Sequence, residues 1–267
     1  MTLSSTRVTF SAAAIVAVVA ATIFSYAVPR TQAVTTIESG DLIRGQSFTA
    51  VYYMGEDGFR YVFPNDKAYF TWYTDFNDVK FISDAELAKI QIGGNVTYKP
   101  GVKMVKINTD PKTYAIAAGG TLRHVSSEAV AIALYGSNWN TKIDDIADGF
   151  FTNYVIGDPI NSASEYNPSV VSSNVSDIND DKSLMAPAEI SITDDGYSPV
   201  DVTIEPGQGV RFTNTGSEDH TATADDLSWG TGTLHSGDSF IREFAEVDTY
   251  TFFDSYNSAN TGAIYVE

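Results

Sequence analysis

The C-terminal part of the chain alternates apolar and polar residues with a period of two. Seven short alternating segments, separated by Gly, Pro and Asp, occur between residues 188 and 267. They are AEISITDD, VDVTIEP, VRFTNTG, HTATADD, DSFIREFAE, TYTFFDS and GAIYVE. Such alternation is typical of strands with one face in a core and one in water. We therefore predict an all-β Greek-key sandwich over residues 188–267.

The middle region, residues 36–160, carries one pattern twice, beginning at Val51 and again at Tyr114. Each copy has an apolar strand, a glycine turn, a second strand and a polar helix start. An aromatic-bearing helix, a second helix start and an Ile-Gly pair follow in each copy. This order predicts a duplicated α+β unit, a β-hairpin followed by short helices. When the second strands of the two copies are aligned by Arg60 and Arg123, His124 takes the place that Tyr61 has in the first copy.

Two further segments differ from these in composition. Residues 8–28 are uncharged and consist mostly of Ala, Val and Ile. They predict a signal peptide or an N-terminal membrane anchor over residues 1–33, and the length fits either. Residues 161–187 are rich in Ser, Asn and Asp and lack periodicity, so we interpret them as a linker.

Charge and cysteine content restrict the chemistry. The formal net charge is -18, from 16 basic and 34 acidic residues. An acidic surface repels nucleic acid, so we expect cations or basic surfaces as partners, with weak cation binding possible. The absence of cysteine excludes disulfides, thiolate catalysis and thiolate-bound metals. Aromatic residues are frequent in the middle region, and we expect most in the core and some at a contact surface for a glycan or protein.

The doubled middle region resembles a repeat of uncharacterised secreted or surface proteins of bacteria. That resemblance implies location and carries no functional residue. The C-terminal region resembles the cupredoxins of the plastocyanin type, on the runs ITDDGYSPVDVTIEPGQGVRFTNTGSEDHTATAD, GTGTLHSGDSFIREF and TYTFFDSYNSANTGAIYV.

The resemblance implies a copper site that has lost most of its ligands. Cupredoxins bind copper with an upstream His and with a Cys, a His and a Met on one C-terminal loop. His220 matches the upstream ligand, Asp254 stands at the Cys position, Asn257 at the second His position and Asn260 at the Met position. We therefore expect no bound metal or cofactor, while zinc or calcium near His220 stays open as an alternative.

These observations predict a non-enzymatic extracytoplasmic protein, secreted or anchored at the cell surface, that binds an unknown surface protein or glycan or has a structural role. The alternative is a metal-handling or redox protein of cupredoxin type with a non-classical site around His220. A hydrolase would require His124, His220 and His235, the chain's three histidines, to converge.

Overall fold

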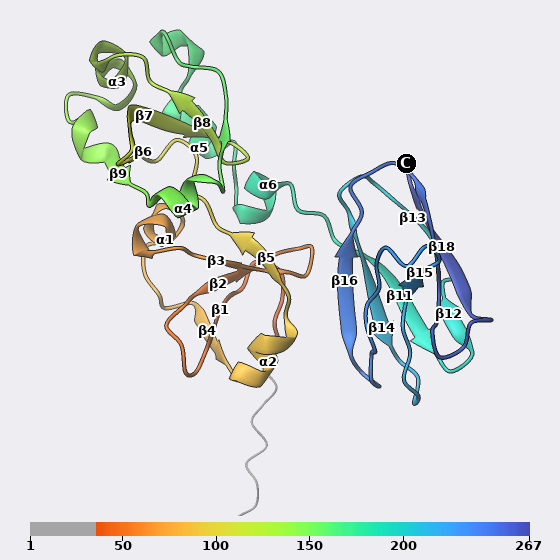
Figure 1. Ribbon diagram of the computed structural model, residues 1–267. Coiled ribbons are helices and arrows are strands. Elements are labelled where there is room, and N and C mark those ends of the chain that lie inside the picture. The colour runs from red at the N-terminus through yellow and green to blue at the C-terminus, as the bar shows by residue number, and fades with distance from the viewer. Residues whose placement is uncertain (1–35) are drawn as a thin grey trace, which may run out of the picture. The chain divides into compact units, whose positions relative to one another are not determined.

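The computed structural model describes residues 36–267, which contain two five-stranded sheets and two four-stranded sheets with short helices between them (Figure 1). The predicted signal peptide or anchor lies outside the described residues. Across residues 36–267, no helix has both the length and the apolar character needed to span a membrane.

The first sheet has the strand order β4-β1-β2-β3-β5. Its strands β1, β2 and β3 form an antiparallel meander, and β4 and β5 add in parallel at the two edges, beside β1 and β3. The elements are β1 (Leu42–Gly45), β2 (Tyr52–Met54), β3 (Arg60–Val62), α1 (Asp66–Trp72), β4 (Val79–Ile82), α2 (Asp84–Lys89) and β5 (Ile92–Asn95).

The second sheet has the strand order β10-β8-β7-β6-β9. Again three strands form an antiparallel meander, and a parallel strand lies at each edge. The elements are β6 (Met104–Ile107), β7 (Asp110–Ala117), β8 (Thr121–His124), α3 (Glu128–Tyr135), η1 (Trp139–Lys142), β9 (Ile143–Asp145), α4 (Asp148–Phe151) and β10 (Val155–Ile156).

The two sheets share their strand order, and their antiparallel meanders share the pairing register. Tyr52 pairs with Val62 in the first sheet and Tyr114 with His124 in the second, so both partners shift by the same 62 positions. By this register, His124 in the second sheet is equivalent to Val62 in the first, so the alignment by arginines is wrong by one residue. Arg60 and Arg123 occupy register positions one residue apart, so their side chains point to opposite faces of their strands. The sequence does not show this difference, whereas hydrogen-bond pairing fixes which residue faces the core.

The helix starts follow from side-chain caps. The Asn65 side chain accepts a hydrogen bond from the Ala68 amide at 2.9 Å, and the Ser127 side chain accepts one from the Val130 amide at 3.3 Å. Each satisfies an amide that the first turn leaves without a partner. Ser83 begins α2 with a reciprocal capping box to Glu86.

The polar segment over residues 161–187, interpreted from its composition as a linker, has regular structure and buried side chains. It contains η2 (Ala163–Glu165), α5 (Pro168–Ser173) and α6 (Ile178–Lys182). Tyr166, Val175 and Ile178 in this segment are each at most 5% exposed. A few apolar anchors among many polar residues are enough to hold a short segment on a core, so mean composition misleads here. Residues 184–187, between α6 and β11, contain no helix or strand.

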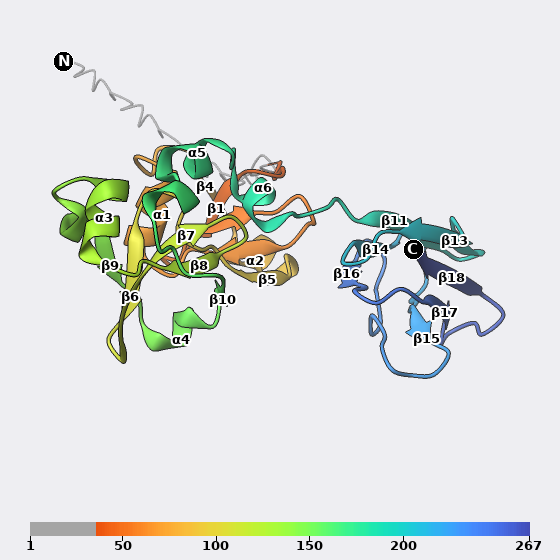
Figure 2. The same cartoon turned by 90° about the horizontal axis from the view of Figure 1, so that it is seen from above.

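The C-terminal region is a sandwich of two four-stranded sheets that face each other (Figure 2). One sheet has the order β12-β11-β14-β16 and the other β13-β18-β17-β15. All seven segments predicted from alternation contain a strand, and β12 is an additional one. The strands are β11 (Ala188–Thr193), β12 (Gly196–Ser198), β13 (Asp201–Ile204), β14 (Gly209–Asn214), β15 (Thr223–Ala224), β16 (Ser239–Glu243), β17 (Thr249–Phe253) and β18 (Thr261–Val266).

The sandwich core takes side chains from both sheets. Phe212 of β14 and Phe252 of β17 meet edge to face, with ring centroids 5.4 Å apart, and neither is exposed to solvent. Trp229 packs on Phe252 and Phe244. This aromatic cluster fixes the ends of β14 and β17, and those ends carry the polar residues of the candidate site.

Candidate functional site at the end of the sandwich

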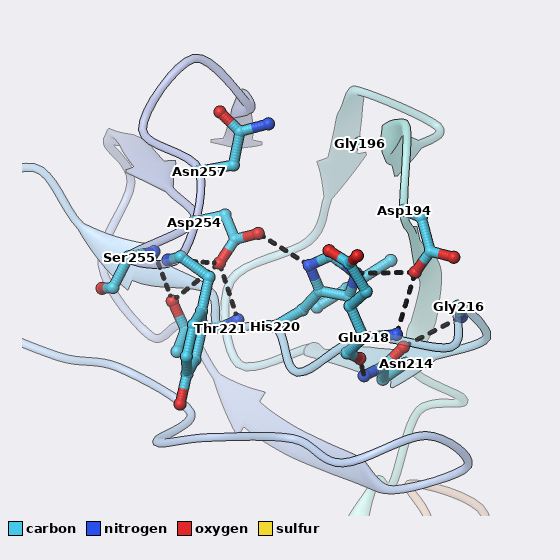
Figure 3. A network of polar contacts seen from close by, with 12 residues as sticks. Asp194, Gly196, Asn214, Gly216, Glu218, His220, Thr221, Asp254, Ser255 and Asn257 are labelled. Atoms are coloured by element: carbon cyan, nitrogen blue, oxygen red, sulfur yellow. Dashed lines mark hydrogen bonds and ion pairs between the residues drawn. The ribbon is translucent and has the colours of Figure 1, made fainter.

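His220 lies in the loop between β14 and β15 and is 2% exposed (Figure 3). Its backbone amide and carbonyl pair with Leu234 at 3.1 and 2.8 Å. Asn214, fully buried at the end of β14, donates hydrogen bonds to the carbonyls of Glu218 and Leu234, both at 2.7 Å. The loop is therefore held at both of its sides, which fixes the position of the imidazole.

Asp254 directly follows β17 and is 0% exposed. Its Oδ2 lies 2.8 Å from His220 Nδ1, and its Oδ1 accepts hydrogen bonds from the amides of Thr221 and Tyr256, both at 3.0 Å. A buried carboxylate is tolerated only where hydrogen bonds or an opposite charge replace its hydration. Asp254 has both.

Asp194 follows β11 and approaches the other nitrogen of the imidazole, with Oδ1 3.2 Å from His220 Nε2. It also accepts hydrogen bonds from the Ser217 amide and hydroxyl, both at 2.8 Å, and from the Glu218 amide at 3.1 Å. His220 is thus held between two carboxylates that come from different strands (Figure 3).

The charges of this group support one another. Burial lowers the pKa of His220, but its hydrogen bonds and charge attraction to Asp254 and Asp194 outweigh burial and raise that pKa above its usual value. The Glu218 amide, the Ser217 hydroxyl and His220 hold the pKa of Asp194 well below its usual range. An imidazolium donates from both nitrogens, so it satisfies both carboxylates at once.

Asn257 and Asn260 do not join this network. The Asn257 side chain accepts a hydrogen bond from the Ala259 amide at 3.3 Å, within its own loop. Asn260 is half-buried beside Gly196, where an added Cβ would lie 3.4 Å from Asn260 Oδ1. Of the three loop positions that the cupredoxin resemblance assigns, Asp254 alone contacts His220.

The residues present do not fit a cupredoxin copper ion. His220 Nδ1 is hydrogen-bonded directly to Asp254, His220 Nε2 faces Asp194, and the sequence has no cysteine to supply a thiolate. The two carboxylates lie on different nitrogens of one ring and so do not converge on one point. Within the described residues, no three His, Cys, Asp or Glu side chains gather as a metal site.

The other histidines lie apart from His220 in their contacts. His124 is on β8 and packs against Tyr114, with ring centroids 5.9 Å apart. His235 is exposed and its Nδ1 lies 2.7 Å from Asp219 Oδ1, which raises the pKa of His235. Among residues 36–267, no serine or threonine hydroxyl contacts either nitrogen of His220, because both nitrogens face carboxylates.

Sequence reasoning missed Asp194. The residue lies in ITDDGYS, where two adjacent aspartates at the end of a strand read as an ordinary turn. Only the parallel pairing of β11 with β14 brings that turn to the loop that carries His220. Sequence order separates the two residues, and no local signal connects them.

Comparison with known proteins gives a partial likeness. No known protein family and no curated protein matches the sequence. Similar solved structures include a purple cupredoxin from Nitrosopumilus maritimus, with 26% identity over 30% of this chain and 99% of that one and a TM-score of 0.29. A copper-containing nitrite reductase from Thermus scotoductus is 19% identical over 30% of this chain and 22% of that one, with a TM-score of 0.28.

An oxidized amicyanin variant is 17% identical over 30% of this chain and 82% of that one, with a TM-score of 0.28. These neighbours are cupredoxins, and the likeness extends over less than a third of the chain.

Proposed function

We propose that this chain is a non-enzymatic extracytoplasmic protein that binds a partner or has a structural role at the cell surface, with a sandwich that has given up copper. The observation that carries the copper-free part of the proposal is the direct contact between His220 and Asp254, 2.8 Å apart and buried. The extracytoplasmic part is supported by the uncharged apolar run at residues 8–28 of the sequence. In a metal site these two positions would face an ion. Here each group is the other's partner, so the pair stabilises the loop and needs no metal.

The same geometry argues against hydrolysis as a role for this site. A serine-type nucleophile needs one imidazole nitrogen as its base, with the other nitrogen oriented by a carboxylate. Both nitrogens of His220 already contact carboxylates. The alternative of metal handling around His220 would require Asp194 or Asp254 to exchange its imidazole contact for the ion.

We also propose that the two five-stranded units are copies of one repeat. Support comes from the shared strand order, the shared pairing directions and the common 62-position shift that relates β1 to β6, β2 to β7 and β3 to β8. An experimental structure in which β9 or β10 pairs at a different place from β4 or β5 would contradict this.

Copper titration tests the sandwich. The purified protein should remain colourless on addition of Cu(II), because no thiolate is available for charge transfer. The triple variant Asp254→Cys, Asn257→His and Asn260→Met should acquire a strong visible thiolate-to-copper band. The double variant Asn257→His with Asn260→Met is the matched control and should stay colourless. A coloured parent protein, or a folded triple variant without the band, would refute the copper-site assignment.

Cell fractionation tests location. The full-length chain should be recovered from the envelope or the medium of its host, detected with an antibody against residues 188–267. Recovery with the cytoplasmic proteins would overturn the extracytoplasmic assignment.

A further inference from the structure

A surface cavity lies between the end of β3 and the start of α1 of the first five-stranded unit, and Phe150 from α4 of the second unit also lines it. Its volume is about 440 Å³, within the range of small-molecule sites. Aromatic side chains form part of its wall, and amides and a carboxylate form another part. These residues include Phe63, Tyr69, Phe76, Asn65, Asp66 and Asn95.

The aromatic part of the wall is rigid and partly open to solvent. Phe76 stacks on Tyr69 with ring centroids 4.3 Å apart and an interplanar angle of 23°. Phe63 meets the same tyrosine edge-on at 5.0 Å. Phe76 nevertheless remains 48% exposed. Full burial of such a side chain stabilises a fold by about 1.5–3 kcal/mol, so this position keeps apolar surface that the fold does not use.

The polar part of the wall keeps hydrogen-bonding capacity. Asn65 uses its Oδ1 to cap α1, and its Nδ2 bonds to no other described residue. Asn95 donates from Nδ2 to Asn153 Oδ1 at 3.1 Å, which leaves its own carbonyl oxygen available. Asp66 is exposed and joins none of the ion pairs among residues 36–267. The cavity therefore offers both donors and acceptors beside a flat apolar ring.

The second unit has a smaller cavity, of about 150 Å³, at the equivalent place. With the exception of Trp139, each residue that lines it stands 62 positions after a residue that lines the first cavity. Phe76 and Trp139 also correspond, because each lies four residues beyond the last residue of the first helix of its unit. The shared positions include the pairs Ala50 and Lys112, Val62 and His124, Asn65 and Ser127, Asp66 and Glu128, and Tyr69 and Ala131.

The residue types that the two cavities have in common limit the class of ligand that could bind in both. Each has an aromatic ring, a polar cap residue and one carboxylate. The carboxylate disfavours an anion, as does the net charge of -18. Lys112 and His124 in the second cavity disfavour a cation there. A ligand that suits both is neutral, carries several hydroxyls and has an apolar face, and a sugar ring has these properties.

We propose that the first cavity binds one or two units of a neutral polysaccharide, with Phe76 against the apolar face of a sugar ring and Asn65, Asp66 and Asn95 at its hydroxyls. This assignment rests on the proposed function in taking binding as the protein's role. The second cavity is a weaker copy of the site, since its volume is about 150 Å³ against about 440 Å³ and Ala131 stands where the first cavity has the ring of Tyr69.

The test is calorimetric titration of the intact purified chain with three neutral tetrasaccharides, a β-1,4-glucan, a β-1,4-linked N-acetylglucosamine oligomer and an α-mannan. Phe76→Ala should weaken binding of the preferred tetrasaccharide at least about fivefold, the effect of removing a central contact. Asp66→Asn, which preserves size and touches no core residue, should weaken it by about threefold. Trp139→Ala should have a smaller effect than Phe76→Ala.

Phe81→Ala is the matched control. Phe81 is 59% exposed on β4 of the same unit, against Arg44 and outside the cavity, so its removal should leave affinity unchanged. Melting curves of all variants check that the fold is retained, and Asp66→Asn keeps the test valid if Phe76→Ala unfolds.

Three results would overturn the sugar assignment. They are no binding of any of the three tetrasaccharides, binding that neither Phe76→Ala nor Asp66→Asn weakens, and Asp66-dependent binding of tetramethylammonium in place of sugar. None of these results changes the expected outcome of the copper titration or of the cell fractionation. Failure of the sugar assignment is therefore distinguishable from failure of the proposed function.

Discussion

The end of the sandwich and the cavity of the first unit use similar residue types in opposite ways. At the sandwich end, His220 and two aspartates turn toward one another, and the carboxylate of Asp254 is completely buried. At the cavity, Asp66 and the half-exposed Phe76 turn toward open space. Polar groups that satisfy each other stabilise a fold, whereas groups left open are available to a ligand.

The largest expected effect comes from breaking the sealed network. Asp254→Ala removes the partner of His220 and of two backbone amides, and should lower the free energy of unfolding of the sandwich by about 3–5 kcal/mol. Chemical denaturation followed by the fluorescence of Trp229 measures it, in a background that carries Trp72→Phe and Trp139→Phe. Asp226→Ala is the control, because Asp226 is exposed in the same sandwich and accepts one hydrogen bond from Ser228. Equal decreases in the free energy of unfolding for the two variants would show that the buried pair of His220 and Asp254 stabilises the sandwich no more than an exposed hydrogen bond does.

A smaller effect is expected from pH. The pKa of His220 is higher in the folded protein than the ordinary value of about 6.5. The stabilisation from its charged form is therefore complete below about pH 6.5 and lost as the pH rises through the raised value. Asp194 has a lowered pKa, so its contribution is complete above about pH 4 and lost only in stronger acid.

Melting temperatures between pH 5 and pH 9 test this dependence. The parent sandwich should be more stable at pH 5.5 than at pH 8.5, and His220→Gln should flatten the slope over that range. His235→Gln should change the slope less, because His235 is exposed and its contact with Asp219 is screened by water. A parent profile that rises from pH 6 to pH 9 would contradict the assignment of charge to His220.

The smallest effect is expected at the cavity. Asp66→Ala should change the free energy of unfolding by less than about 0.5 kcal/mol, because Asp66 is exposed and holds no other side chain. Thermal unfolding of the variant measures it. A loss comparable to that of Asp254→Ala would mean that Asp66 serves the fold, and the contrast between sealed and open residues would fail.

The sandwich shows which strands can be predicted from the local alternation of apolar and polar residues. Alternation locates its seven main strands because each side chain of a strand points to one of two faces, and burial of one face leaves a period of two. The short β12 contributes a single buried residue, Tyr197, which is too little for a pattern. In the segment with α5 and α6, composition does not reveal the helices, since the few buried apolar residues stand among many Ser, Asn and Asp residues.

The candidate sites show the same limit. His220 and Asp254 can be singled out from the sequence, because both lie in runs that resemble a known family. Asp194 as the second carboxylate, and the open wall formed by Phe76 and Asn65, cannot be read in this way. They depend on side chains from separate elements meeting in space.

The sequence by itself determined the chemistry that is available to this protein. It excludes a thiolate, sets the strong negative charge and places alternating strands and capped helices along the chain, because each of these depends on residue type and near neighbours. Only the tertiary structure decided that His220 is sealed between Asp194 and Asp254, and that the two five-stranded units carry cavities in matching register. Long-range strand pairing brings those residues together, and no short stretch of sequence records which distant strand will be its neighbour.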